Sequence, residues 1–153
     1  YHNGSFRFFL TVDYTYSSTC PCSFELAYDA RTKRQAAANA HSQRSILKVT
    51  VEFGEDIVWI EDIVDLCRAV IPTEVQIVVK RMDEQAFAEL NGSNLLFSED
   101  ACRLMHEALD KWYDAGKIVD FNIVVSHFES LHPWQAIAIT SKFDNELTAG
   151  KLA

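Results

Sequence analysis

The chain has 153 residues, a formal net charge of −8 at pH 7 and a pI near 5.0. Its hydrophobic content of 48% and charged content of 24% are those of a soluble globular protein, and the length predicts one domain with a single core. The acidic balance argues against a non-specific grip on nucleic acid, and no apolar run reaches the ~20 residues of a membrane helix. We therefore expect neither nucleic acid nor a membrane as a partner. An anionic substrate would need a local cluster of cationic side chains.

The start of the chain and its cysteines bear on its origin and compartment. The sequence opens at Tyr1 without a signal-peptide pattern, which indicates processing or a segment of a longer protein. Of the four cysteines, Cys67 and Cys102 lie in stretches with helical spacing, where a free cysteine is usually a small buried hydrophobe. The other two form the pair Cys20-Pro-Cys22. A disulfide framework is not indicated, and we expect a cytoplasmic protein.

Hydrophobic periodicity predicts the elements of the first half of the chain. Alternation over residues 6–16 predicts a strand with one buried face, and residues 45–53 predict a second one. Residues 30–40 are charged and lack β-branched side chains, so we expect a loop there with at most a short helix. Helical spacing over residues 57–70, ended by Pro72, predicts the first long helix.

The second half repeats the same kinds of pattern. Residues 73–81 alternate, which predicts an extended element with Val75, Ile77 and Val79 facing inward. Further along we predict a short helix over 82–90, a helix from Ser98 as N-cap to about Ala115, strands over 119–128 and 134–140, and a frayed polar tail over 141–153.

This order of elements predicts an α+β protein. Strands at both ends of the chain and helices between them favour an antiparallel sheet with helices packed on one face. We see no repeat or linker within residues 1–153, so the whole chain is expected to be one domain.

Several polar features lie outside the expected core pattern. They are Cys20 and Cys22, His41 in AHSQRS, Glu84 in KRMDE, Glu129 and His132 in FESLH, and the cations Arg44, Lys80 and Arg81. Thiolate, imidazole and carboxylate together are ligands for Zn²⁺ or a similar divalent ion. Each feature also has a plainer interpretation: a redox-active or incidental cysteine pair, a solvated histidine, an acidic first helical turn, a turn acid, or a surface pair of cations.

Taken together, four segments resemble one enzyme family. YSSTCPCS, AHSQRS, VKRMDEQAF and FESLH occur in the order and approximate spacing of the type IB GTP cyclohydrolase I family, and the resemblance runs from about Phe6 to Thr140. It implies the tunnelling fold (T-fold), whose unit is two strands, two helices and two strands. Members carry two such units, and this chain resembles the C-terminal one. The resemblance also implies a homotetramer with active sites where subunits meet.

The resemblance implies roles for individual residues. Cys20 resembles a metal ligand and reactive thiol, whereas Cys22 resembles structural support. His41 and His132 match histidines at the metal, Glu84 matches a carboxylate beside it, and Glu129 matches the acid that anchors the guanine or pterin ring. The expected cofactor is Zn²⁺, or alternatively Mn²⁺ or Fe²⁺.

The implied reaction is hydrolysis of GTP to 7,8-dihydroneopterin triphosphate and formate, the first step of tetrahydrofolate biosynthesis. Cys20, His41 and His132 would act in the chemistry, with His132 as a proton shuttle. The cations that could hold the triphosphate are Arg44, Lys80 and Arg81.

Two departures and two alternatives stay open. The segment between CPCS and HSQRS is longer than in the shortest relatives, and Pro133-Trp134 follows His132 where relatives often have a small or polar residue and then a histidine. One alternative is the deazaguanine nitrile reductase of the same fold, which pairs a cysteine with a purine-anchoring glutamate but does not need His41 and His132. The other is a non-catalytic binding or oligomerisation module derived from the enzyme.

Overall fold

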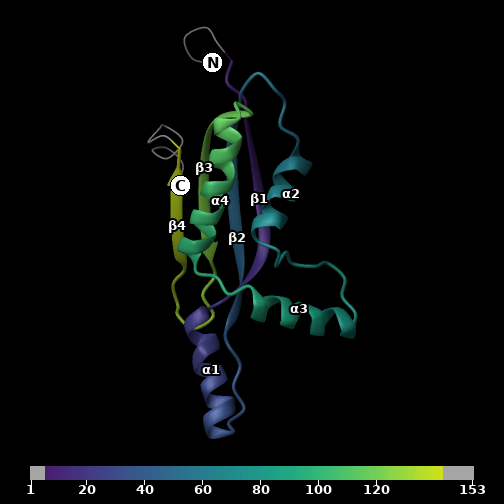
Figure 1. Cartoon of the computed structure of the whole chain (residues 1–153), viewed down its shortest axis with the longest axis vertical. Helices are drawn as coiled ribbons and strands as arrows, with labels where there is room; N and C mark the ends of the chain where they lie inside the picture. The colour runs from purple at the N-terminus through teal and green to yellow at the C-terminus, as the bar shows by residue number, and fades with distance from the viewer. Residues whose placement is uncertain (1–5, 143–153) are drawn as a thin grey trace.

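The computed structural model describes residues 6–142. It is an α+β domain with a four-stranded, fully antiparallel sheet in the order β1-β2-β3-β4 (Figure 1). The elements are β1 (Phe9–Thr19), α1 (Pro21–Arg34), β2 (Ser42–Phe53), α2 (Ile60–Val70), α3 (Arg81–Ser93), α4 (Ser98–Asp114), β3 (Ile118–His127) and β4 (Ala136–Ser141). The predicted α+β class is confirmed, and two strands, a set of helices and two strands follow one another as expected. Two helices exceed the expected unit: α1 lies between the first two strands, and three helices rather than two lie between β2 and β3.

Helices α2 and α4 cover one face of the sheet, with α2 against β1 and α4 against β3 and β4 (Figure 1). Alternate residues of the strands point into this layer, because side chains alternate faces along a strand. One row of the sheet shows the pattern, since Tyr14 lies opposite Leu47, which lies opposite Val125, and all three are buried. The core is therefore the space between the sheet and these two helices.

The buried cysteines behave as the sequence predicts. Cys67 in α2 and Cys102 in α4 are 0% and 4% exposed and belong to the hydrophobic core. Burial raises the pKa of the Cys67 thiol to about 12 and that of Cys102 to about 11. All four cysteines are free thiols, and these two are held in their unreactive protonated form.

The expected loop at residues 30–40 is partly wrong. Helix α1 runs from Pro21 to Arg34, and only the residues after it are irregular. Proline suits the first turn of a helix, whose N–H groups have no intrahelical partner, and Arg and Lys are good helix formers near a C-terminus. Gln35 ends the helix with a left-handed backbone, φ 53°. Helix α1 projects past the end of the sheet (Figure 1).

The predicted extended element at residues 73–81 is also wrong beyond its first residues. Ser17 N–H donates to the carbonyl of Thr73 across 2.9 Å, and Val75 N–H donates to the carbonyl of Thr15 across 3.1 Å. The chain then leaves the edge of β1, and Ile77, predicted to face inward, is fully exposed. Alternation indicates a strand only where a neighbour supplies hydrogen-bond partners and covers one face.

The remaining boundaries shift by a few residues. The helix predicted to start at 57 begins at Ile60, because the carboxylate of Asp62 accepts a hydrogen bond from Trp59 N–H just before it. Ser98, predicted as the N-cap, is the first helical residue of α4, and Phe97 precedes the helix as its N-cap. The carboxylate of Asp100 accepts a hydrogen bond from the N–H of Phe97. Helix α3 continues to Ser93. The predicted tail lies almost wholly outside the described residues. Among residues 6–142, no helix is long and apolar enough to cross a membrane.

Candidate functional site

The antiparallel topology brings the chemically interesting segments to one end of the sheet. Because the strands are antiparallel in this order, one end of the sheet holds the end of β1, the start of β2, the end of β3 and the start of β4. A cavity of about 290 Å³ lies there. Its lining is Cys20, His41, Gln43, Leu96, Phe97, Ser98, Glu99, His127, Glu129, Leu131, His132, Trp134 and Ala136.

Backbone hydrogen bonds hold the CPCS and AHSQRS motifs together. Cys20 N–H donates to the carbonyl of His41 across 3.3 Å, and His41 N–H donates to Oγ of Ser23 across 3.0 Å. Cys20 directly precedes helix α1 and is partly exposed at the cavity. Cys22 is exposed in the first turn of α1 and is not part of the cavity lining. Only Cys20 of the two thiols therefore borders the cavity.

A single amide links two of the predicted site residues. Oε1 of Gln43 lies 3.0 Å from Nδ1 of His41, and Nε2 of Gln43 lies 3.5 Å from Oε1 of Glu129. The same Nε2 donates to Oγ of Ser18 across 3.0 Å, and this hydroxyl lies 2.8 Å from Oγ of Ser45. The Gln43 side chain is 8% exposed, whereas His41 and Glu129 are half-buried. The histidine and the carboxylate therefore belong to one hydrogen-bonded chain.

A buried aromatic pair borders this network. Tyr16 and His127 are opposite Ser45 on neighbouring strands, and the Tyr16 hydroxyl lies 2.7 Å from Nε2 of His127. Burial lowers the pKa of His127 to about 4, so its imidazole is neutral at pH 7. Burial also raises the pKa of Tyr16, which stays protonated. Only His127 of the pair is part of the cavity lining.

The N-terminus of helix α4 contributes an ionised carboxylate to the cavity. Glu99 accepts a hydrogen bond from its own backbone N–H and another from Ser98 Oγ across 2.9 Å, and these bonds lower the pKa of its carboxyl. The positive end of a helix also favours negative charge at this position. The cavity thus presents two carboxylates, that of Glu99 and that of Glu129.

His132 lies in the connection between β3 and β4 and lines the cavity. Its ring stacks on Trp134 with centroids 4.7 Å apart and an interplanar angle of 5°. Both side chains are exposed. The tryptophan, which departs from the pattern of the family, therefore supplies a flat apolar support for the imidazole.

The structure does not bring the remaining predicted residues to this cavity. Arg44 is exposed, because alternation along β2 turns Gln43 and Ser45 inward and Arg44 to the opposite face. Lys80, Arg81 and Glu84 are exposed at the start of α3. None of these four residues is in the cavity lining.

The donor set for a metal is present in type but not assembled. Cys20, His41 and His132 all line the cavity, and these residue types suit a divalent ion. Within residues 6–142, however, no three His, Cys, Asp or Glu side chains converge closely enough to hold a metal ion. The predicted ligands therefore do not fit together as a metal site in the single chain as it stands.

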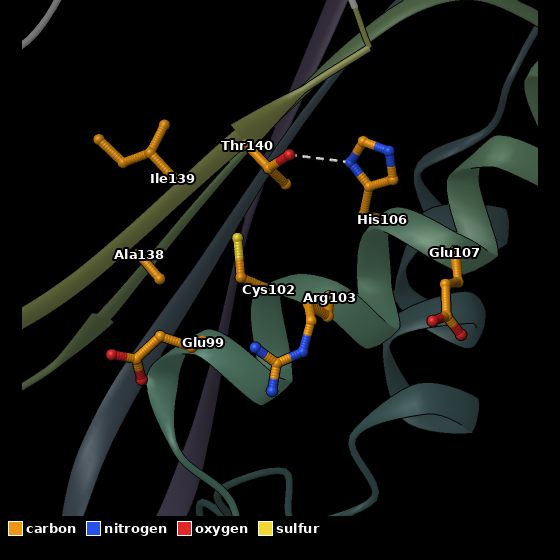
Figure 2. Close-up of a pocket in the computed structure, with 8 residues that line it drawn as sticks. All are labelled: Glu99, Cys102, Arg103, His106, Glu107, Ala138, Ile139 and Thr140. Carbon is orange, nitrogen blue, oxygen red and sulfur yellow. Dashed lines mark hydrogen bonds between the residues drawn. The ribbon is translucent and has the colours of Figure 1, made fainter.

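A second cavity, of about 410 Å³, lies between α4 and β4 (Figure 2). Cys102, Arg103 and His106 line it from the helix, and Ala138 and Thr140 from the strand. The thiol is held protonated by burial, and Nδ1 of His106 lies 2.9 Å from Thr140 Oγ1. None of the predicted site residues lines this second cavity, whereas Cys20, His41, Glu129 and His132 line the cavity at the end of the sheet, which is therefore the candidate site.

Gln43, His127 and Glu99 are among the polar residues of that site that sequence reasoning missed. Gln43 stands inside the AHSQRS motif, His127 closes an apolar strand two residues before Glu129, and Glu99 resembles an ordinary first-turn acid. The two-residue spacing from His41, just before β2, to Gln43 in β2 was the available signal, since residues two apart in extended chain lie on one face.

Comparisons with known proteins agree with the motifs. A family model described as type I GTP cyclohydrolase FolE2 matches residues 1–138. The chain is 50% identical over 143 residues to GTP cyclohydrolase FolE2 of Dinoroseobacter shibae, covering 92% of this chain and 38% of the relative. It is 50% identical over 133 residues to GTP cyclohydrolase FolE2 of a Ruegeria species, covering 86% of this chain and 35% of the relative. Among solved structures, an archaeosine synthase QueF-Like in the apo form matches with a TM-score of 0.46 and 11% identity, over 86% of this chain and 92% of that one.

The fold and the cavity define an α+β domain with a thiol, imidazoles and carboxylates at one end of its antiparallel sheet. The chain belongs to the type I GTP cyclohydrolase FolE2 family. It spans little more than a third of the length of these curated relatives.

Proposed function

We propose that the protein acts as a GTP cyclohydrolase. It hydrolyses the guanine ring of GTP, releases formate and leaves 7,8-dihydroneopterin triphosphate, the first step of tetrahydrofolate biosynthesis. Family membership supports this function. The observation that carries it is that Cys20, His41, Glu129 and His132, from three separate motifs, line one cavity.

Glu129 is suited to hold the guanine edge. An ionised carboxylate has two acceptor oxygens and can receive hydrogen bonds from two adjacent N–H groups of the base. Glu129 is half-buried, which strengthens such bonds relative to bulk water. The stacked pair of His132 and Trp134 lies at the same cavity, where a proton carrier is required during ring opening.

A divalent metal ion, Zn²⁺ or alternatively Mn²⁺ or Fe²⁺, is part of the proposal. Its ligands would be Cys20, His41, His132 and Glu84, and when bound it would supply hydroxide at neutral pH by lowering the pKa of water. The types of donor support this assignment. Because no three of these side chains converge in the single chain, the set would be completed by a rearrangement of the cavity residues together with α3, or by ligands from another subunit. Whichever way the ligand set is completed, Glu129 would orient the base and His132 would carry protons.

In the single chain no predicted cation lines the cavity, so binding of the triphosphate is proposed to depend on assembly of subunits. We propose a cytoplasmic homotetramer in which cations at subunit boundaries, with Arg44, Lys80 and Arg81 as candidates, bind the triphosphate. Their exposure supports this role, because exposed cationic side chains can contact a triphosphate that is bound in the site of a neighbouring subunit. Such local cations are needed in a chain whose net charge is −8.

The test is incubation of the protein with GTP and a divalent ion, with pterin fluorescence as the readout. The proposal predicts a fluorescent pterin that is absent without protein. NADPH oxidation with a deazaguanine nitrile and no pterin would instead favour the reductase. Because the chain spans about a third of its relatives, a non-catalytic module is the second candidate. Nucleotide binding or self-association without turnover would favour it.

A further inference from the structure

We propose that Gln43 is a positioning residue, which orients the carboxylate of Glu129 and holds His41 in the tautomer that carries its proton on Nδ1. This inference deepens the proposed function and rests on it for the role of Glu129. The assignment of the tautomer does not depend on the reaction.

The direction of the Gln43 amide follows from its neighbours. Nε2 lies 3.5 Å from Oε1 of Glu129, and an ionised carboxylate only accepts hydrogen bonds. The amide nitrogen must therefore face Glu129 and Ser18, because an amide oxygen in its place would meet the carboxylate oxygen without a proton between them. Consequently Oε1 faces His41.

The direction of the amide then fixes the proton on the imidazole. An amide oxygen only accepts, so Nδ1 of His41, 3.0 Å away, must donate. Oγ of Ser130 lies 3.3 Å from the same Nδ1 and is a longer, second acceptor for that proton. In the neutral ring, Nε2 is left with the lone pair, which can take up a proton or bind a metal ion.

Burial makes the arrangement firm. Gln43 is 8% exposed and Ser18 and Ser45 are 0% exposed, so the serine pair anchors the amide away from solvent. A buried amide that lost one of these partners would leave polar atoms unpaired. The Gln43 amide therefore orients both the carboxylate of Glu129, which is proposed to bind the guanine ring, and the imidazole of His41, which is proposed to act in the reaction.

Two substitutions separate the two arms of the amide. Gln43→Glu keeps an oxygen acceptor toward His41 and replaces the donor toward Glu129 by a second carboxylate oxygen. Gln43→Leu keeps the approximate volume and removes both arms. The matched controls are Gln76→Glu and Gln76→Leu, because Gln76 is exposed and lies outside the cavity lining.

The first readout is the ring nitrogen-15 NMR signal of His41 in metal-free protein, which distinguishes the two tautomers. We expect an Nδ1–H ring in the wild type and in Gln43→Glu, and a shift toward Nε2–H in Gln43→Leu. The second readout is steady-state kinetics with GTP. We expect Gln43→Glu to act mainly through KM, and kcat/KM to fall roughly 10- to 100-fold in both Gln43 variants, the usual range for supporting partners of a site.

The outcomes separate this inference from the proposed function. The tautomer shift in Gln43→Leu, with unchanged signals in the Gln76 variants, supports the inference even if the wild type does not turn over GTP. Absence of GTP turnover in the wild type would count against the proposed cyclohydrolase activity and not against the role of Gln43. An Nε2–H ring in the wild type, or an unchanged tautomer and unchanged KM in folded Gln43→Leu, would overturn the inference. Near-ultraviolet circular dichroism reports folding, and if Gln43→Leu fails to fold, Gln43→Glu decides through its KM.

Discussion

The Tyr16 hydroxyl and Nε2 of His127 share a 2.7 Å hydrogen bond at a depth where Tyr16 is 0% and His127 2% exposed. Their rings meet edge to face, with centroids 5.8 Å apart. The pair connects β1 to β3 across Ser45 of β2, beside the candidate site. Because His127 borders the cavity, this buried contact links the stability of the domain to the integrity of the site.

Stability should fall in acid because of His127. Its pKa is lowered from 6.5 to about 4 by burial, so between these values the unfolded chain binds more protons than the native one. The free energy of unfolding therefore rises with pH across this window, and the stabilisation is lost as pH falls from 6.5 toward 4. The loss from this one group is on the order of 3 kcal/mol.

Urea unfolding at pH 7 and at pH 4.5 measures this effect, with His127→Gln as the comparison. The variant keeps a polar group near Tyr16 and has no imidazole to protonate, so its stability should depend less on pH. Parallel pH dependence in wild type and variant would remove His127 as the cause.

The two neighbouring thiols should differ in function. Cys20 lines the cavity and Cys22 is exposed outside it. We expect Cys20→Ala to abolish GTP turnover and Cys22→Ala to leave a measurable part of it. Pterin fluorescence measures both, with circular dichroism as the check on folding. Equal losses in two folded variants would contradict the roles assigned to the pair.

Glu129→Gln should weaken recognition of the base. The substitution keeps the size but turns one acceptor oxygen into a donor that faces the N–H groups of guanine, leaving polar groups unpaired at about 1–3 kcal/mol. With charge-assisted hydrogen bonds also lost, kcat/KM for GTP should fall at least ~100-fold.

Metal content provides the control for this variant. Glu129→Gln should hold as much metal as the wild type, whereas His132→Ala should lose both metal and turnover. A Glu129→Gln protein that loses metal and binds GTP normally would show that another residue holds the ring.

Metal dependence follows from the proposed ligand set. Chelation should silence turnover and a divalent ion should restore it. His41→Ala should weaken metal binding by roughly 10-fold or more, because it removes a ligand and loss of supporting partners alone can cost that much. Metal titration followed by mass spectrometry of bound ions measures the affinity. Full activity in metal-free protein would rule out this chemistry.

The strands and the long helices could be predicted because burial imposes a period on the sequence. Strand β2 alternates through Leu47, Val49 and Val51, all of them 0% exposed, and its location follows from that pattern alone. Residues 75–79 carry the same pattern and form no strand, since pairing depends on a neighbour that periodicity does not reveal.

The candidate site was predictable only through motifs. Cys20, His41, Glu129 and His132 came from segments with a family resemblance, and the strand order of the sheet then explains why they line one cavity. The roles of Gln43 and His127 depend on which atoms lie within hydrogen-bonding distance across three strands. Such contacts are set by tertiary register, which a single sequence does not display.

Release of C8 of guanine as formate is the reaction that most directly tests the proposed function. The measurement uses GTP labelled with carbon-13 at C8, incubated with the metal-supplemented protein and followed by carbon-13 NMR. We expect labelled formate to accumulate in step with pterin for the wild type and at least ~100-fold more slowly, at subsaturating GTP, for Glu129→Gln. Labelled carbon that stays in the purine, in protein shown to bind both the metal ion and GTP, would contradict the proposed function.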